Sequence, residues 1–132
     1  MIISPVLWQE IVDHALADAP NECCGMIASS DGHAVRVIRA TNAAASPLYY
    51  ELDPREQLRI QNEIDDGGLD LGAIYHSHTR TAPKPSQTDI GFAANLPGIE
   101  WIIVGLTNAD APEVRSYLIE DGRVEEVALE VD

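Results

Sequence analysis

The chain has 132 residues, which fits one domain and is too short for two of ordinary size, so we expect a single domain over residues 1–132. Its 22 acidic and 8 basic residues give a formal net charge of −14. This charge repels nucleic-acid phosphates and anionic lipid surfaces, and no stretch of about 18 apolar residues occurs, so we expect no nucleic acid and no membrane as a partner.

The two cysteines, Cys23 and Cys24, are adjacent and cannot form the long-loop disulfide that stabilises small secreted domains. Cys24 lies in an apolar run, which favours packing over thiol chemistry. The first ten residues contain no basic segment followed by an apolar one, as a signal peptide would. These features predict a cytoplasmic protein.

The first half of the sequence predicts two helices and a hairpin between them. A Ser-Pro pair at residues 4–5 resembles an N-cap and a first helical residue, and apolar residues then recur every three or four positions to about Pro20. The runs CCGMIASS and AVRVIRA predict a β-hairpin, and LYYEL predicts a brief strand. An Asp-Pro pair at residues 53–54 predicts a second helix that ends near Asp66, before two glycines.

The second half predicts four strands and a short helix. LDLGAIYHSH is typical of a buried strand, and SQTDIGFAAN of a short helix. Three further strands are predicted over EWIIVGL, EVRSYLIE and RVEEVALE, the last two joined by a turn at Asp121 and Gly122. The elements together predict a mixed sheet with about three helices, an α/β or α+β fold.

Two histidines at the end of one predicted strand give the clearest functional signal. Side chains alternate along a strand, so His76 and His78 project from one face, with Cα atoms about 6.5–7 Å apart. Asp89 falls in the first turn of the next helix, where its carboxylate can point back toward the strand. Two imidazoles and a carboxylate suit Zn²⁺ with water as the fourth ligand, and zinc lowers the pKa of that water to about 7.

Hydrolysis also requires proton transfer and stabilisation of negative charge. Glu22 lies just before the apolar run CGMI, where it can enter the core region and take a proton from water. Ser86 can donate a hydrogen bond to the developing oxyanion. These two residues are therefore candidates for catalytic roles.

Each of these residues also has an ordinary structural interpretation. Alternating polar residues suit any half-exposed strand, and Ser86 with Asp89 matches a helix capping pattern. Glu22 taken alone would be a solvated glutamate. We interpret His14 and His33 as bystanders, the first on the polar side of its helix and the second in a turn.

Taken together, E-x-x-G followed by H-S-H, seven residues, S, two residues and D resembles the motif of the JAMM (MPN+, Mov34) zinc metalloproteases. The resemblance covers nearly the whole chain and implies a curved mixed sheet of about six to seven strands flanked by about three helices, the cytidine-deaminase-like arrangement. It implies one zinc ion per chain, bound by His76, His78 and Asp89. It also implies Glu22 as the general base and Ser86 as the residue that stabilises the tetrahedral intermediate.

Within this family, four segments are similar to the bacterial CysO-cysteine peptidase branch: ECCGMI, TNAAASPLYYELDPREQLRI, IYHSHTRTAPKPSQTD and RSYLIEDG. That similarity implies hydrolysis of the amide bond after the C-terminal Gly-Gly of a small ubiquitin-like sulfur carrier protein, with release of cysteine or another residue. The pathway can be cysteine biosynthesis or another sulfur pathway. A homodimer is also possible. Thr79 departs from the His-x-His-Pro pattern common in JAMM proteins.

The same resemblance implies a groove for the Gly-Gly tail. A thin, flexible tail can add to an exposed strand edge, where main-chain hydrogen bonds supply affinity. We expect the walls to come from the loop Thr79 to Pro85 and from Ser46, Pro47, Leu48 and Tyr49. Arg80 or Lys84 would meet a terminal carboxylate, although loop charges are also commonly solvated.

Two other classes of protein share part of this pattern. Amidohydrolase-like metal enzymes also begin with His-x-His on a strand, but their barrel needs about 250 residues and further histidine ligands. No histidine follows Asp89 in this chain, so we set that interpretation aside. The alternative from another class is a noncatalytic MPN scaffold that binds partners without metal, and such domains lack the ligand residues that are present here.

Overall fold

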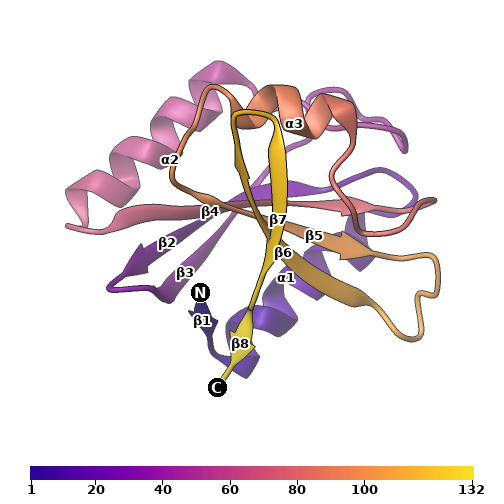
Figure 1. The fold of residues 1–132 in the computed structure, drawn as a ribbon, viewed down its shortest axis with the longest axis horizontal. Coiled ribbons are helices and arrows are strands. Elements are labelled where there is room, and N and C mark those ends of the chain that lie inside the picture. Colours follow the sequence, from indigo (N-terminus) through magenta and orange to yellow (C-terminus); the bar gives the residue numbers. More distant parts are fainter.

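The computed structural model describes residues 1–132 and contains three helices and one curled, eight-stranded mixed sheet (Figure 1). The strand order is β7-β6-β5-β4-β2-β3-β1-β8. The mixed sheet and the three helices confirm the predicted fold class, but the sheet is larger than the six to seven strands expected. The strands β1 (Ile2–Ile3) and β8 (Glu130–Val131) extend one edge, and two-residue strands are too short to show an alternating pattern.

The other six strands place the candidate site residues at one end of the sheet. Their bounds are β2 (Cys24–Ser30), β3 (His33–Ala40), β4 (Asp70–His78), β5 (Glu100–Gly105), β6 (Glu113–Glu120) and β7 (Arg123–Val127). The antiparallel register of β2 and β4 pairs Cys24 with His76. Glu22, two residues before Cys24, therefore lies at the same end of the sheet as the two histidines.

The helices α1 (Pro5–Asp18), α2 (Pro54–Asp66) and α3 (Gln87–Ala93) cover the two faces of the sheet. Ser4 and Asp53 cap α1 and α2 by accepting backbone hydrogen bonds, and a proline follows each cap, as the sequence predicted. None of the three helices combines the length and the apolar character that a membrane-spanning helix needs.

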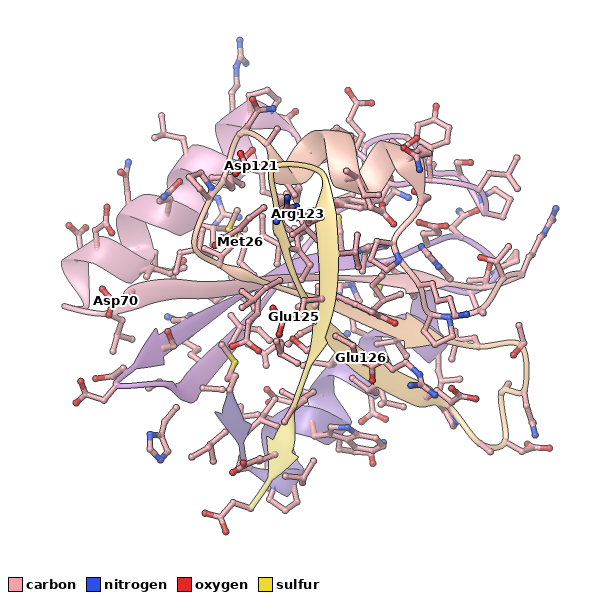
Figure 2. The ribbon with its side chains drawn as sticks, in the orientation of Figure 1. Met26, Asp70, Asp121, Arg123, Glu125 and Glu126 are labelled. Atoms are coloured by element: carbon pink, nitrogen blue, oxygen red, sulfur yellow. The ribbon has the colours of Figure 1, made fainter.

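Two apolar clusters lie on opposite faces of the sheet. One contains Ile60 and Ile64 of α2 together with Met26, which Figure 2 shows between the sheet and α2. The other contains Ile11 and Ala15 of α1. Along the end of β4 the side chains alternate: Ala73 and Tyr75 enter the cluster of α1, and Ile74 enters the cluster of α2. Both histidine ligand candidates, at even positions after Ile74, therefore face the α2 and α3 side.

Two strand predictions were wrong in part. LYYEL forms no strand, and its only ladder contact is an isolated bridge between Asn42 and Leu52. Backbone groups of this loop bond to the Asn42 side chain instead of to a neighbouring strand. The strand predicted over RVEEVALE ends at Val127, and the chain then leaves β6 to pair with β1 through β8.

His14 was predicted on the polar side of α1, but its side chain is buried and only 4% exposed. Its Nδ1 lies 2.7 Å from the Tyr75 hydroxyl of β4, and its Nε2 lies 3.2 Å from the Asp18 carboxylate. A polar side chain is tolerated inside because both ring nitrogens have partners. His33 is exposed at the start of β3, as expected for a residue beside a turn.

Candidate metal centre

His76, His78 and Asp89 converge at the end of β4 and the start of α3. The Nε2 atoms of the two histidines are 3.1 Å apart. Asp89 Oδ2 lies 3.2 Å from His76 Nε2 and 3.3 Å from His78 Nε2. All three side chains are buried. The strand and the helix thus bring three potential ligand atoms into a nearly equilateral triangle.

The dimensions of this triangle fit a tetrahedral metal ion. Ligand atoms about 2.0–2.1 Å from an ion at tetrahedral angles lie about 3.3–3.4 Å from one another. The buried carboxylate oxygen and the two imidazole nitrogens can all direct a lone pair at a cation placed between them. Two imidazoles and a carboxylate are hard and borderline donors of the kind that divalent metals prefer in enzymes. The residues present therefore fit a divalent metal.

The two imidazole rings are oriented by different contacts. His78 Nδ1 donates a hydrogen bond to the carbonyl oxygen of Ala82 at 2.9 Å, which leaves Nε2 with a free lone pair. His76 stacks on Tyr50, with ring centroids 4.5 Å apart and planes 27° apart. The Nδ1 atom of His76 is buried and has no hydrogen-bond partner in the protein. Packing rather than hydrogen bonding therefore sets the plane of the His76 ring.

Asp89 is fixed by the cap of α3. Its Oδ2 accepts a hydrogen bond from the Ser86 N–H at 2.9 Å, and its own N–H donates to Ser86 Oγ at 3.1 Å. Burial alone would raise the pKa of Asp89, but hydrogen bonds from His76 and His78 and from the Ser86 backbone hold that pKa well below its ordinary value. The capping pattern and the candidate ligand pair are therefore one arrangement.

The environments of the two histidines shift their pKa values in opposite directions. Burial lowers the pKa of the fully buried His76. Burial acts in the same direction on His78, but hydrogen bonds to Asp89 and Ala82, with the charges of Asp89 and Glu22, raise the pKa of His78 above 6.5. In the absence of a metal, a proton therefore binds His78 more readily than His76.

Glu22 faces the same cluster from the segment before β2. One carboxylate oxygen of Glu22 and one ring nitrogen from each of His76 and His78 lie within 4.8 Å of one another. Asp89 lies within 4.0 Å of both histidine Nε2 atoms and Glu22 does not, so Asp89 is the better candidate for the third ligand and Glu22 lies beside the metal position. Glu22 is only 5% exposed, and burial, with a smaller effect of Asp89, raises its pKa to about 7 against the opposing charge of His78. Such a carboxylate can exchange a proton near neutral pH.

The strand β4 also ties the backbone beside Glu22 to the histidines. Cys23 N–H donates to Ser77 Oγ at 2.8 Å, and Ser77 N–H donates to the Cys23 carbonyl oxygen at 3.2 Å. Ser77 lies between the two histidines and is fully buried. This pair of bonds fixes the separation between the Glu22 segment and the end of β4.

The remaining predicted site residues surround this cluster. Ser86 is exposed, and because its Oγ accepts from Asp89 N–H, its hydroxyl hydrogen is free for another acceptor. Ser46 accepts a hydrogen bond from Glu22 N–H at 2.9 Å, and Pro47 accepts one from Thr79 Oγ1 at 3.3 Å. Both loops predicted to line the groove are therefore adjacent to the Glu22 segment or to the end of β4.

The four predicted groove side chains with the longest reach are exposed. Leu48 is 70% exposed and Tyr49 about half exposed. Arg80 and Lys84 are exposed as well, and neither forms a salt bridge. These side chains are accessible to a partner, which is a requirement for the proposed groove.

Sequence reasoning missed two residues of the site. Tyr50 stacks on His76 and is buried, although its neighbour Tyr49 is not. Asn42 makes hydrogen bonds to several segments of the surrounding loop and is also buried. The one signal in the sequence was a single asparagine in a loop otherwise rich in small residues, TNAAASP, which does not reveal its partners.

Comparisons with known proteins show the family of the chain. The family described as prokaryotic homologs of the JAB domain matches residues 4–120. The CysO-cysteine peptidase of Mycobacterium tuberculosis is 38% identical over 99% of this chain and 90% of its own length. A probable TtuB-protein conjugate cleaving protease of Thermus thermophilus is 36% identical over 95% of this chain and 78% of its own.

Solved structures share the fold along the whole chain. The solution structure of a Desulfitobacterium hafniense protein is 30% identical, with a TM-score of 0.89 over 100% of this chain and 93% of that one. A JAB1/MPN domain protein from Archaeoglobus fulgidus, 22% identical, has a TM-score of 0.68 over 100% of this chain and 96% of its own. The chain thus belongs to the prokaryotic JAB-domain family and is a metallopeptidase of the JAMM type.

Proposed function

We propose that the protein is a zinc-dependent peptidase that hydrolyses the amide bond after the C-terminal Gly-Gly of a small ubiquitin-like sulfur carrier. The reaction releases cysteine, or another C-terminal residue, and regenerates the carrier. The convergence of Glu22 on the triangle of His76, His78 and Asp89 carries the proposal. The name of the Mycobacterium tuberculosis relative, a CysO-cysteine peptidase, supports this substrate class.

The metal ligands, Glu22 and Ser86 each have a separate role in the reaction. Zinc held by His76, His78 and Asp89 would polarise the scissile carbonyl group and lower the pKa of a bound water to about 7. Glu22 accepts the proton of the attacking water and then donates it to the leaving amine, a role that suits a pKa near 7. The free hydroxyl hydrogen of Ser86 donates to the oxygen that becomes negative in the tetrahedral intermediate.

The substrate tail enters between residues 46–49 and the loop of residues 79–85. The hydrogen bond from Thr79 to Pro47 joins these two segments. Glycines lack side chains, so a Gly-Gly tail can approach the buried metal position closely. Exposed Leu48 and Tyr49 pack against the carrier, and the loop cations Arg80 and Lys84 attract the terminal carboxylate of the substrate in an otherwise acidic protein.

A second candidate substrate is a protein conjugate of such a carrier. The name of the Thermus thermophilus relative describes conjugate cleavage, which favours this candidate. The bond that is broken follows the same Gly-Gly, and the leaving amine belongs to a lysine instead of a free amino acid. The chemistry of Glu22 and the metal ligands is unchanged, so only the substrate distinguishes the two activities.

Intact-mass spectrometry of carrier substrates tests the proposal. The metal-loaded protein is incubated with carriers that end in Gly-Gly-Cys, with other Gly-Gly-Xaa tails, and with a carrier joined to a lysine side chain. We expect loss of one residue from Gly-Gly-Cys, no reaction after chelation, and a fall of about 10²–10⁴-fold in Glu22→Gln. Glu10→Gln, at an exposed position of α1, is the matched control and keeps full activity. Failure to cleave any of these substrates would refute the proposal.

A further inference from the structure

Asn42 joins the Glu22 segment to the neighbouring loop. Its side chain is only 7% exposed, although it lies outside any helix or strand. Its Nδ2 donates to the carbonyl oxygen of Glu22 at 2.9 Å and to that of Tyr49 at 3.0 Å, with a longer contact of 3.5 Å to the carbonyl of Ser46. One amide group therefore contacts three main-chain oxygens from two segments.

The other end of the Asn42 side chain shapes the loop itself. Its Oδ1 accepts hydrogen bonds from the N–H groups of Ala44 and Glu51, both at 3.0 Å. The loop is closed further by a backbone bond from Ala43 N–H to the Glu51 carbonyl at 2.9 Å. Asn42 thus sets the conformation of residues 42–51 with Oδ1 and attaches them to the Glu22 segment with Nδ2.

The position of Glu22 depends on these loop contacts. Its N–H donates to the Ser46 carbonyl and its carbonyl accepts from Asn42, so both of its backbone polar groups bond to the loop. The regular pairing of β2 with β4 begins only at Cys24. The Glu22 carboxylate itself makes no hydrogen bond in the structure, so its direction is set by its backbone and by packing.

We propose that Asn42 is a positioning residue, which aims Glu22 at the metal ligands and couples it to the loop that receives the substrate. This inference rests on the proposed function, in which Glu22 is the general base. A substrate that packs against residues 46–49 then acts on the same hydrogen bonds that hold Glu22. Asn42 forms no hydrogen bond with His76, His78 or Asp89, and its only link to the ligands is the loop residue Tyr50, which stacks on His76. Its loss is therefore expected to change turnover more than metal binding.

Asn42→Asp is the sharpest variant because it replaces the donor NH₂ with an oxygen and keeps the acceptor oxygen. Its second oxygen would face the carbonyl of Glu22 and repel it. We expect kcat on a Gly-Gly-Cys carrier to fall about 10–100-fold, since a displacement of about 1 Å can cost 10²-fold, and the metal Kd to change by a smaller factor than kcat. Asn62→Asp adds the same charge at an exposed position of α2 and keeps wild-type kcat.

A smaller, neutral substitution keeps the inference testable if the charged variant does not fold. The hydroxyl of Asn42→Ser can keep a local turn bond to the Ala44 N–H but cannot reach Glu22. We expect it to lower kcat as Asn42→Asp does. A double-mutant cycle with Glu22→Asp, whose carboxylate is one methylene shorter, separates positioning from general stability. If Asn42 acts through Glu22, the fall in kcat of the double variant is smaller than the product of the two single falls. If Asn42 is merely structural, the two falls multiply.

Amide hydrogen exchange provides a measurement that does not require activity. The Glu22 N–H should exchange faster in both Asn42 variants than in the wild-type protein, because its acceptor on Ser46 is released with the loop. Wild-type kcat together with unchanged Glu22 exchange in these variants would overturn the inference. A wild-type protein that cleaves no Gly-Gly substrate would instead refute the proposed function, while the exchange data still test the link between Asn42 and Glu22.

Discussion

A Cβ atom added to Gly105 would lie 2.8 Å from Cδ of Pro83, so only glycine at the end of β5 allows the loop after β4 to lie against the sheet. Tyr117 donates a hydrogen bond to the Pro83 carbonyl at 2.6 Å and holds the loop from the neighbouring strand. The preceding residue, Ala82, accepts the hydrogen bond that orients His78. The absence of a side chain at Gly105 therefore contributes to the geometry of a candidate metal ligand.

Gly105→Ala should weaken metal binding. The added methyl group displaces Pro83 and with it the Ala82 carbonyl, and loss of such a supporting contact typically costs about 10–100-fold in metal affinity. Competition with a chelator measures the change. Gly91→Ala on α3 is the control, because a Cβ there meets nothing within 4 Å. An unchanged metal Kd in Gly105→Ala would contradict this account of the loop.

Metal binding should weaken as the pH falls below neutrality. The pKa of His78 is raised in the metal-free protein, and a protonated imidazole cannot bind a metal, so one proton must leave on binding. The apparent affinity is therefore expected to be constant above the raised pKa and to fall by up to about tenfold per pH unit below it. Titrations at three pH values between 5.5 and 8 measure this dependence, and an affinity that is equal at all three would show the expectation to be wrong.

The metal-free protein should lose stability in acid partly through His14. Burial lowers the pKa of His14, against the opposing effect of Asp18, so the unfolded chain takes up this proton more readily than the folded protein. In the unfolded chain the pKa of His14 is about 6.5, and above this pH the contribution of neutral His14 to stability is complete. The contribution declines as the pH falls from there toward the lower pKa that His14 has in the folded protein. His14→Gln cannot titrate.

Urea unfolding at pH 7.5 and pH 5.5 gives the free energy of unfolding for this comparison. The wild-type protein should lose more of that free energy between the two pH values than His14→Gln does. The difference isolates His14, because the other titratable groups are common to both proteins. An identical loss in the two proteins would mean that His14 titrates normally in the fold.

The cysteines should be unreactive in the folded protein. Burial is the main cause that raises the pKa of both Cys23 and Cys24 to about 12, so almost no thiolate forms at pH 8. A thiol reagent at pH 8 should modify neither residue in the native state and both after unfolding. Peptidase activity should survive the treatment. Rapid labelling of the folded protein with loss of activity would point instead to thiol chemistry.

Much of the metal cluster was predictable because its residues are close in the sequence. The alternation of β4 places His76 and His78 on one face, and the capping pattern places Asp89 at the start of α3. Both signals depend on local structure alone. The position of Glu22 depends on the pairing of β2 with β4. Its place before the apolar run CGMI indicated only that it can enter the core region, and the family resemblance gave its role. The catalytic roles of Glu22 and Ser86 stay predictions.

The failures have a common physical cause, which is a partner supplied by a distant segment. His14 is polar and looks solvent-facing on α1, but the hydroxyl of Tyr75, 61 residues away, allows its burial. Asn42 likewise takes partners from both sides of its loop, up to 20 residues away. The two-residue strands β1 and β8 exist only because they pair with each other and because β1 also pairs with β3. No local pattern encodes such contacts.

One divalent metal is expected to bind between His76, His78 and Asp89, with Glu22 beside it. Anomalous diffraction at the zinc absorption edge, from crystals of the zinc-loaded protein, tests it most directly. We expect one peak per chain, about 2.0–2.2 Å from the two Nε2 atoms and from Asp89 Oδ2. A peak bound by Glu22 in place of Asp89, or zinc bound only elsewhere on the protein, would contradict it.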